Sequence, residues 1–209
     1  MPIYDISREL HAGMAVWPGD SPYELRSVLS RAGGDSVNLT TLTLSAHTGS
    51  HVDAPYHFSD DGPRMDAVDL SAYWGLAQVV TVARDSGPLE PADFAGHDLG
   101  RAPRLLVHSA ASAGDATVFP AAFVYPSPAL ADHLGRLGVA LYGTDAPSMD
   151  AADSATLPGH NALRRNGIAI LEGLDLTGVP DGLYELVALP LKIAGGDGSP
   201  VRAALRALE

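Results

Sequence analysis

The sequence predicts a single domain of mixed α/β class, with a mixed β-sheet at its core and a few flanking helices. The chain has 209 residues, which is enough for one hydrophobic core and short for two. Hydrophobic residues make up 46% of it and charged residues 18%, as in ordinary globular proteins. Short apolar runs are separated by scattered glycines and prolines, which favours many strands and few helices.

Seven apolar runs have the length and composition of β-strands. The first ends in a period-two alternation rich in threonine, and the others are dominated by valine, leucine and isoleucine. The predicted strands are 39–46, 76–82, 104–108, 139–142, 168–171, 183–189 and 201–205. Segments 11–35 and 53–70 carry turn-forming Pro-Gly-Asp and Asp-Asp-Gly-Pro sequences, so we predict loops there.

Two segments carry the start and stop signals of helices. Segment 128–134 begins with a proline that follows Ser127, and glycines lie shortly after its end. Segment 157–166 also has a proline near its start, and Gly167 is placed to end it. We therefore expect two helices among the predicted strands.

Charge and cysteine content restrict the partners. The formal net charge of −12 disfavours nucleic acid, whose phosphates an acidic surface repels. The chain has no cysteine, so disulfides and thiolate ligands are excluded and any metal must be held by imidazole and carboxylate groups. The N-terminal residues do not resemble a signal peptide and no apolar run is long enough for a membrane span, so we expect a cytoplasmic protein without a membrane partner.

Three of the eight histidines fall within eleven residues, directly after the first predicted strand. They are His47, His51 and His57, and Asp53 lies among them. A glycine and a proline in this segment disfavour a regular helix, so we place it on a tight turn. Two neutral imidazoles and a carboxylate suit Zn²⁺, or Mn²⁺, and leave coordination positions free for water. The alternative is a set of surface or hydrogen-bonded histidines, but their density favours a metal site.

Other candidates are distant in the sequence. His160 begins the second predicted helix, and Glu172 ends a buried strand, where an unpaired carboxylate is costly. A solvent-facing strand end would explain Glu172 equally well. Trp17 in a Pro-Gly loop either packs in the core or lines a pocket. Asp145 and Ser148 follow a buried strand and lie either near a site or in a structural turn. The remaining histidines have no such setting, and we expect structural or exposed positions for His11, His97, His108 and His133.

The segment 47–58 resembles the signature H-x-G-[ST]-H-x-D-x-P-x-H of the cyclase-like metal-dependent hydrolases. Within that family the chain is most similar to the bacterial kynurenine formamidases. Ser50 stands where threonine is more common, and 92–126 carries no motif of the family. The similarity nevertheless covers essentially the whole chain, and the other matching segments are 16–20, 143–150, 153–157, His160, 170–174 and 184–191.

The resemblance implies a swivelling β/β/α domain over residues 1–209 and two metal ions, with zinc the first choice. It implies that His47, His51 and Asp53 hold the first ion. Asp53 and Glu172 would also reach the second ion, which His160 completes.

The resemblance further implies that His57 is the acid/base and that Trp17 lies against the substrate. The expected reaction is hydrolysis of N-formyl-L-kynurenine to L-kynurenine and formate, a step in tryptophan degradation, by a homodimer or larger assembly. A histidine titrates near neutral pH and can protonate the leaving arylamine. The alternatives are a related hydrolase of another aryl or cyclic amide, such as isatin, and a non-enzymatic metal- or ligand-binding protein on the same scaffold.

Overall fold

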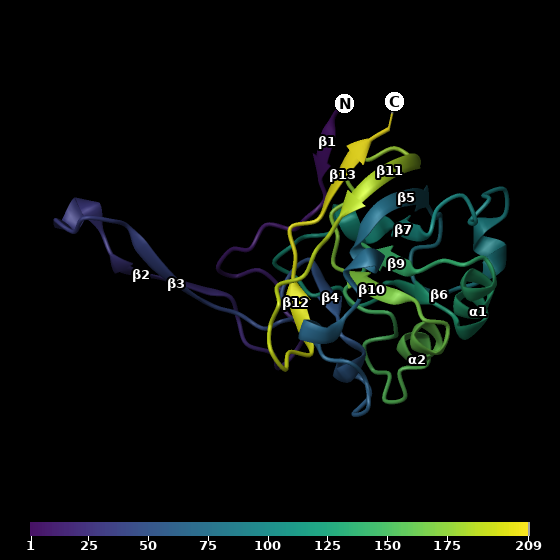
Figure 1. The fold of residues 1–209 in the computed structure, drawn as a ribbon, viewed down its shortest axis with the longest axis horizontal. Helices are drawn as coiled ribbons and strands as arrows, with labels where there is room; N and C mark the ends of the chain where they lie inside the picture. Colours follow the sequence, from purple (N-terminus) through teal and green to yellow (C-terminus); the bar gives the residue numbers. More distant parts are fainter. Residues whose placement is uncertain (209) are drawn as a thin grey trace.

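The computed structural model describes residues 1–208 and confirms the mixed α/β prediction (Figure 1). The described residues form one large sheet with the strands β1 (Ile3–Asp5), β4 (His51–Asp53), β5 (Trp74–Thr81), β7 (Arg104–His108), β9 (Leu141–Thr144), β10 (Ala169–Glu172), β11 (Gly182–Val187), β12 (Gly198–Pro200) and β13 (Ala204–Ala207). Their order is β1-β13-β11-β5-β7-β9-β10-β4-β12. The run from β5 to β10 is parallel and the outer strands pair antiparallel.

The helices α1 (Pro128–Arg136) and α2 (Pro158–Arg165) cover one face of this sheet (Figure 1). Helix α1 begins as the sequence predicts, because the Ser127 hydroxyl accepts a hydrogen bond from the Leu130 amide at 3.1 Å. One apolar cluster lies between the sheet and these helices, and a second lies on the other face of the sheet. Within residues 1–208, neither α-helix has the length and apolar character that a membrane span requires.

The smaller elements lie in the connections between these strands and helices. Two minor strands, β6 (Gly87–Leu89) and β8 (Val124–Pro126), form a parallel pair. The 3₁₀ helices are η1 (Arg31–Gly33), η2 (Pro55–His57), η3 (Met65–Ala67), η4 (Leu70–Tyr73), η5 (Pro91–Phe94) and η6 (Ala110–Ala113).

The sequence predictions fail mainly around the first histidine segment. The predicted loop 11–35 contains the strand β2 (Glu24–Leu29), and the predicted turn contains β4. The last strand, predicted at 201–205, is shifted to β13. β4 is missed because three residues carry too little alternation to reveal a period.

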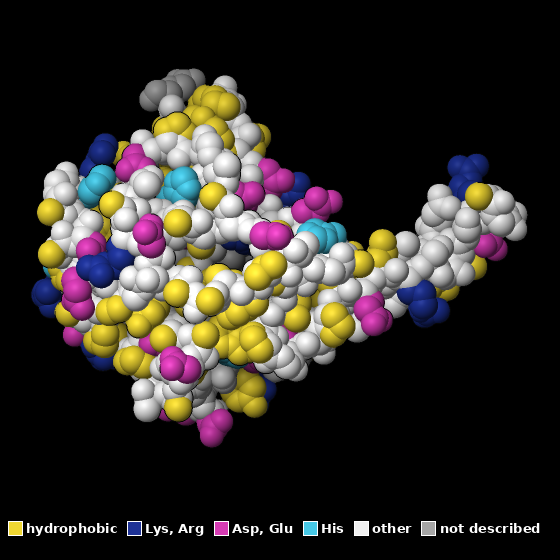
Figure 2. All heavy atoms as spheres, turned by 180° about the vertical axis from the view of Figure 1, so that it is seen from behind, with side chains coloured by type: hydrophobic (Ala, Val, Ile, Leu, Met, Phe, Trp, Pro, Cys, Tyr) yellow, Lys and Arg dark blue, Asp and Glu magenta, His cyan; other side chains and the backbone are white. Residues whose placement is uncertain are grey.

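Strands β2 and β3 (Leu39–Thr43) form an arm that projects from the body of the molecule (Figures 1 and 2). Every residue of both strands is exposed. Leu25 and Leu42 face each other across the ribbon and are 57% and 54% exposed. No residue of either strand is buried by the rest of residues 1–208, and a two-stranded ribbon without a further packing partner is at best marginally stable in water.

Candidate metal centre and pocket

Strands β4 and β10 bring three chemically important side chains to one face of the sheet. His51 and Asp53 alternate with the apolar Val52, so both point to the same side. β10 runs antiparallel to β4 and pairs Glu172 directly with His51. The Nε2 atom of His51 lies 3.3 Å from Glu172 Oε2 and 3.5 Å from Asp53 Oδ1, and all three residues are buried. Glu172 is therefore an inward-facing strand end and not a solvent-facing one.

Helix α2 carries His160 into the same cluster. Asp150 accepts hydrogen bonds from the amides of Gly159 at 2.7 Å and His160 at 3.0 Å, and thereby caps the helix. The same carboxylate accepts a hydrogen bond from His160 Nδ1 at 2.7 Å. The Nε2 atom of His160 is left 3.6 Å from Asp53 Oδ2 and 3.7 Å from Glu172 Oε1. A carboxylate that fixes the far nitrogen of an imidazole is the usual support of a histidine metal ligand.

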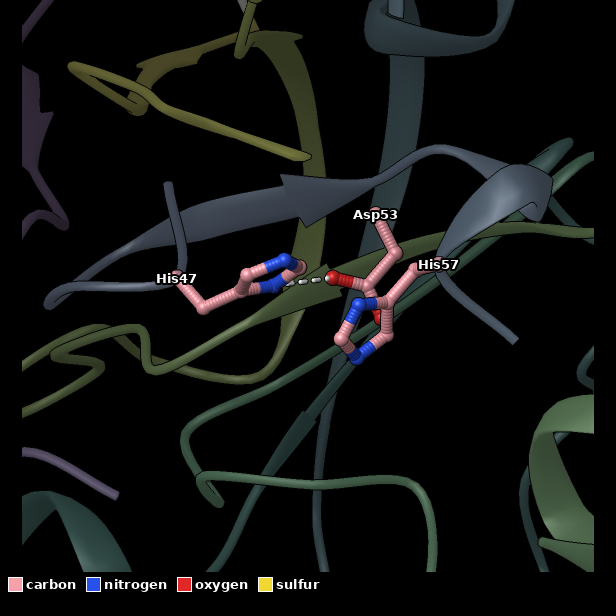
Figure 3. A group of neighbouring side chains, drawn as sticks. All are labelled: His47, Asp53 and His57. Carbon is pink, nitrogen blue, oxygen red and sulfur yellow. Dashed lines mark hydrogen bonds and ion pairs between the residues drawn. The ribbon is translucent and has the colours of Figure 1, made fainter. Parts of the chain in front are cut away.

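His47 and His57 also lie close to Asp53 (Figure 3). His47 Nδ1 lies 3.0 Å from Asp53 Oδ1, and the His57 ring lies against that of His47 with centroids 4.0 Å apart. Ligand atoms of His47, Asp53 and His57 lie within 4.8 Å of one another, and so do those of His51, Asp53 and Glu172. Asp53 thus belongs to two adjacent groups, each with a geometry that could hold a metal ion.

The electrostatics of this cluster are dominated by burial and by opposite charges. Burial alone would raise the pKa of Asp53, but hydrogen bonds from His160 and His47 and the charges of His51 and His47 hold it well below its usual range. Burial alone would lower the pKa of both histidines, yet nearby carboxylates raise it to about 9 for His47 and about 10 for His160. In the metal-free cluster the neighbouring carboxylates therefore favour the protonated forms of His47 and His160.

The donor set fits a divalent metal ion. Glu172 Oε1 is buried and has no hydrogen-bond partner among the described residues. The second nitrogen of His51 is occupied by the carbonyl oxygen of Gly49 at 3.0 Å, as that of His160 is by Asp150. Orphaned buried carboxylate oxygens and imidazoles with one free nitrogen are the groups that Zn²⁺ and Mn²⁺ coordinate.

Raising the pH is expected to destabilise the metal-free protein. The folded-state pKa values of His47 and His160, about 9 and about 10, exceed the ordinary value of 6.5. Their contribution to the free energy of unfolding is therefore complete below pH 6.5 and is lost as pH rises through 9 and 10. Bound metal requires neutral imidazoles and should remove this fall. Thermal unfolding with and without chelator from pH 6 to 10 measures the effect. A metal-free Tm that stays flat or rises with pH contradicts it.

The cluster lies in the wall of a pocket of about 670 Å³. Trp17 also lines this pocket and packs edge-to-face on Phe119 with ring centroids 5.1 Å apart. Trp17 is 37% exposed, so it forms a pocket wall and is not a core side chain. A concave pocket lined by aromatic and apolar side chains with a few polar groups is typical of small-molecule sites.

Asp145 and Ser148 line the same pocket. Both carboxylate oxygens of Asp145, however, accept hydrogen bonds that have a structural role. It accepts hydrogen bonds from the amide and the hydroxyl of both Ser109 and Ser112, at 2.6 to 3.1 Å. Ser112 Oγ in turn accepts a hydrogen bond from the Leu176 amide at 2.9 Å. Asp145 therefore fixes the segment that leads to Phe119.

Three parts of the site are missed by the sequence analysis. Asp150 lies in a matching segment, but nothing in the sequence assigns it to His160. Phe119 lies in the stretch without a recognised motif. Asp197, which contacts both His47 and His57, lies in the glycine-rich sequence 195–200, a signal that could have drawn attention to it. The four other histidines lie outside the residues that line the pocket.

Known proteins are similar to this chain over most of its length. The Cyclase family model, described as "Putative cyclase", matches residues 4–151. The kynurenine formamidase of Geobacillus thermodenitrificans is 44% identical over 205 residues, which cover 98% of this chain and 97% of that protein. The kynurenine formamidase of Salinibacter ruber is 44% identical over 207 residues, which cover 99% and 98% of the two chains.

Solved structures show the same fold. A predicted metal-dependent hydrolase from Bacillus stearothermophilus matches with a TM-score of 0.82 and 27% identity, covering 98% of this chain and 97% of that one. Isatin hydrolase A from Labrenzia aggregata matches with a TM-score of 0.84 and 25% identity, covering 98% and 93%. The fold, the signature segment and the extent of the match together show that this chain belongs to the Cyclase family.

Proposed function

We propose that this protein is a metal-dependent arylformamidase that hydrolyses N-formyl-L-kynurenine to L-kynurenine and formate, a step in tryptophan degradation. The observation that carries the proposal is the 44% identity to kynurenine formamidases over 97% to 98% of their length. The buried His/Asp/Glu cluster in the wall of an aromatic-lined pocket supports it independently, because this arrangement suits hydrolysis of an aryl amide.

The proposed metal ligands are His47, His51, Asp53, His160 and Glu172, for two ions per chain. Zinc is the first choice and Mn²⁺ the second, because both accept imidazole and carboxylate ligands. A bound metal ion lowers the pKa of water and polarises an amide carbonyl, which supplies the nucleophile and the electrophilic activation that this reaction needs.

The chain's own residues bind the substrate and transfer the proton. Trp17 holds the aryl ring, and the surrounding apolar wall excludes water from the reacting carbon. His57 lines the pocket and its side chain is 37% exposed, so it can reach the leaving amine. It donates a proton to the amine nitrogen as the bond from that nitrogen to the formyl carbon breaks.

The isatin hydrolase neighbour favours a second candidate substrate, because isatin is a cyclic aryl amide and that protein has the same fold. At 25% identity this relative is more distant than the kynurenine formamidases. We therefore expect N-formylkynurenine to have the higher kcat/KM when both substrates are assayed with the same preparation.

Hydrolysis of N-formylkynurenine before and after chelation, with Zn²⁺ and Mn²⁺ added back separately, tests the proposal. Formation of kynurenine that is lost on chelation and restored by metal supports both the substrate and the metal. Metal binding without hydrolysis of this substrate rejects the substrate assignment and points to the cyclic amides. Full activity in the metal-free protein rejects the metal.

We further propose that the protein forms a homodimer. The projecting arm supports this proposal. Burial of a leucine side chain contributes about 1.5–3 kcal/mol, and Leu25 and Leu42 form an exposed pair on one face of the ribbon. A second copy of the chain would cover them and supply the packing surface that the arm lacks.

Replacing Leu25 and Leu42 together by aspartate is expected to convert the dimer to a monomer, because two charges would be buried at the interface. The mass measured by light scattering after size-exclusion chromatography reports the change. Thr41→Asp lies on the other face of the same ribbon, opposite Arg26, and serves as the control. A wild-type protein that is already monomeric, or a double variant that remains dimeric, contradicts dimerisation through the arm.

A further inference from the structure

The carboxylate of Asp197 links a proposed metal ligand to the proposed acid/base. Its Oδ2 atom lies 3.0 Å from His47 Nε2 and 3.4 Å from His57 Nδ1. The distances make one oxygen the common acceptor for two rings whose centroids are 4.0 Å apart. Nothing in the family signature includes this residue, which lies 140 positions after His57 in the chain.

The backbone around Asp197 is held on both sides. Its carbonyl oxygen accepts a hydrogen bond from the Ala54 amide at 2.9 Å, and β12 begins with Gly198 paired to Asp53. On the other side, Asp66 Oδ1 accepts a hydrogen bond from the Gly195 amide at 3.1 Å. The carboxylate therefore extends from a fixed point beside the cluster.

Gly198 explains how the loop can approach so closely. A Cβ atom built on Gly198 would lie 2.6 Å from His47 Cε1, closer than side-chain atoms tolerate. Only glycine at this position lets the chain pass beneath the imidazole and present Asp197 to both rings.

We propose that Asp197 is the positioning residue for His57. An acceptor at Nδ1 keeps the proton on that nitrogen, which turns Nε2 into the atom that exchanges protons in the pocket. In the cationic ring both nitrogens carry protons. The Nε2 proton passes to the leaving amine nitrogen. The neutral ring keeps the proton on Nδ1, which donates a hydrogen bond to Asp197.

This inference rests on the proposed function only in naming the leaving amine nitrogen as the group that accepts the proton from His57. The tautomer of His57 is a property of the resting protein and can be measured without substrate. Asp197 also holds the His47 ring, but it is a partner of that ligand and not itself one of the proposed ligands.

Zinc-loaded, full-length protein labelled with ¹⁵N-histidine provides the decisive test. The His57 signals, identified by their loss in His57→Gln, are expected to show the Nδ1–H tautomer in the wild type and a shift towards Nε2–H in Asp197→Ala. In the same variant kcat for N-formylkynurenine should fall about 10- to 100-fold while KM changes less than about 2-fold, as for loss of a group that orients a catalytic side chain. Asp197→Glu should restore part of kcat and of the Nδ1–H signal.

The matched control is Asp66→Ala, which removes the acceptor of the Gly195 amide from the same loop without touching either histidine. It should leave the His57 tautomer and kcat unchanged. All variants are compared at saturating zinc, because Asp197 also holds the ring of His47 and its loss is expected to weaken zinc affinity, as loss of Asp150 is. An unchanged tautomer or an unchanged kcat in zinc-saturated Asp197→Ala overturns the proposal. If the wild type does not hydrolyse the formyl substrate, the proposed function fails while the tautomer measurement still decides the role of Asp197.

Discussion

Asp53→Asn is expected to remove the metal and to lower kcat/KM by roughly 10³-fold or more, since metal ions supply several kcal/mol of transition-state stabilisation. Asp53 is shared by both candidate ligand groups and contacts His47, His51 and His160. Metal analysis of the purified variant and kinetics with N-formylkynurenine measure the two effects.

Asp150→Asn provides a graded comparison for this variant. Asp150 contacts His160 but not the other histidines of the cluster. Its replacement should therefore weaken metal affinity only about 10- to 100-fold. An Asp53→Asn protein that retains a full complement of metal would show that this carboxylate is not a ligand.

His57→Ala is expected to lower kcat by roughly 10²- to 10⁴-fold, the range for loss of a general acid. Metal content should stay unchanged, because the proposed ligands remain in place. The measurement of metal content is needed because the ligand atoms of His57, His47 and Asp53 lie close enough together for His57 to bind a metal ion itself. Metal analysis alongside steady-state kinetics separates an acid/base role from a ligand role.

His97→Ala controls for the loss of a histidine as such, because His97 is exposed and does not line the pocket. It should behave like the wild type. Loss of metal from His57→Ala would make His57 a ligand, and normal turnover would remove it from the reaction.

The central parallel strands and both helices could be predicted from the sequence because each has a long apolar run or clear end signals. β7 contains the run 105–107 of leucine and valine, β10 contains Ile170-Leu171, β5 contains Val79-Val80, and α1 has a serine cap followed by proline. Of the two strands of the arm, β3 agrees with the strand predicted at 39–46, but β2 could not be predicted. Strand β2 is exposed throughout, so no buried face imposes an alternation that a sequence pattern could reveal.

The site was partly predictable for a related reason. His47, His51, Asp53 and His57 are close in sequence, and their density alone indicates a metal site. Asp197 was not predictable, because its approach depends on the pairing of β12 with β4. Three-residue strands pair through tertiary context, which local propensity does not contain.

The first and last strands of the main sheet are neighbours, with Ile3 of β1 opposite Arg206 of β13 (Figure 1). A short linker could therefore join the two ends of the chain, and new ends could be opened in an exposed connection elsewhere. Opening the chain at the tip of the arm, around η1, would leave every strand and helix of the body intact. Such a circular permutant would place a fused reporter at the far end of the arm, where its signal would report on the proposed pairing of two copies of the chain.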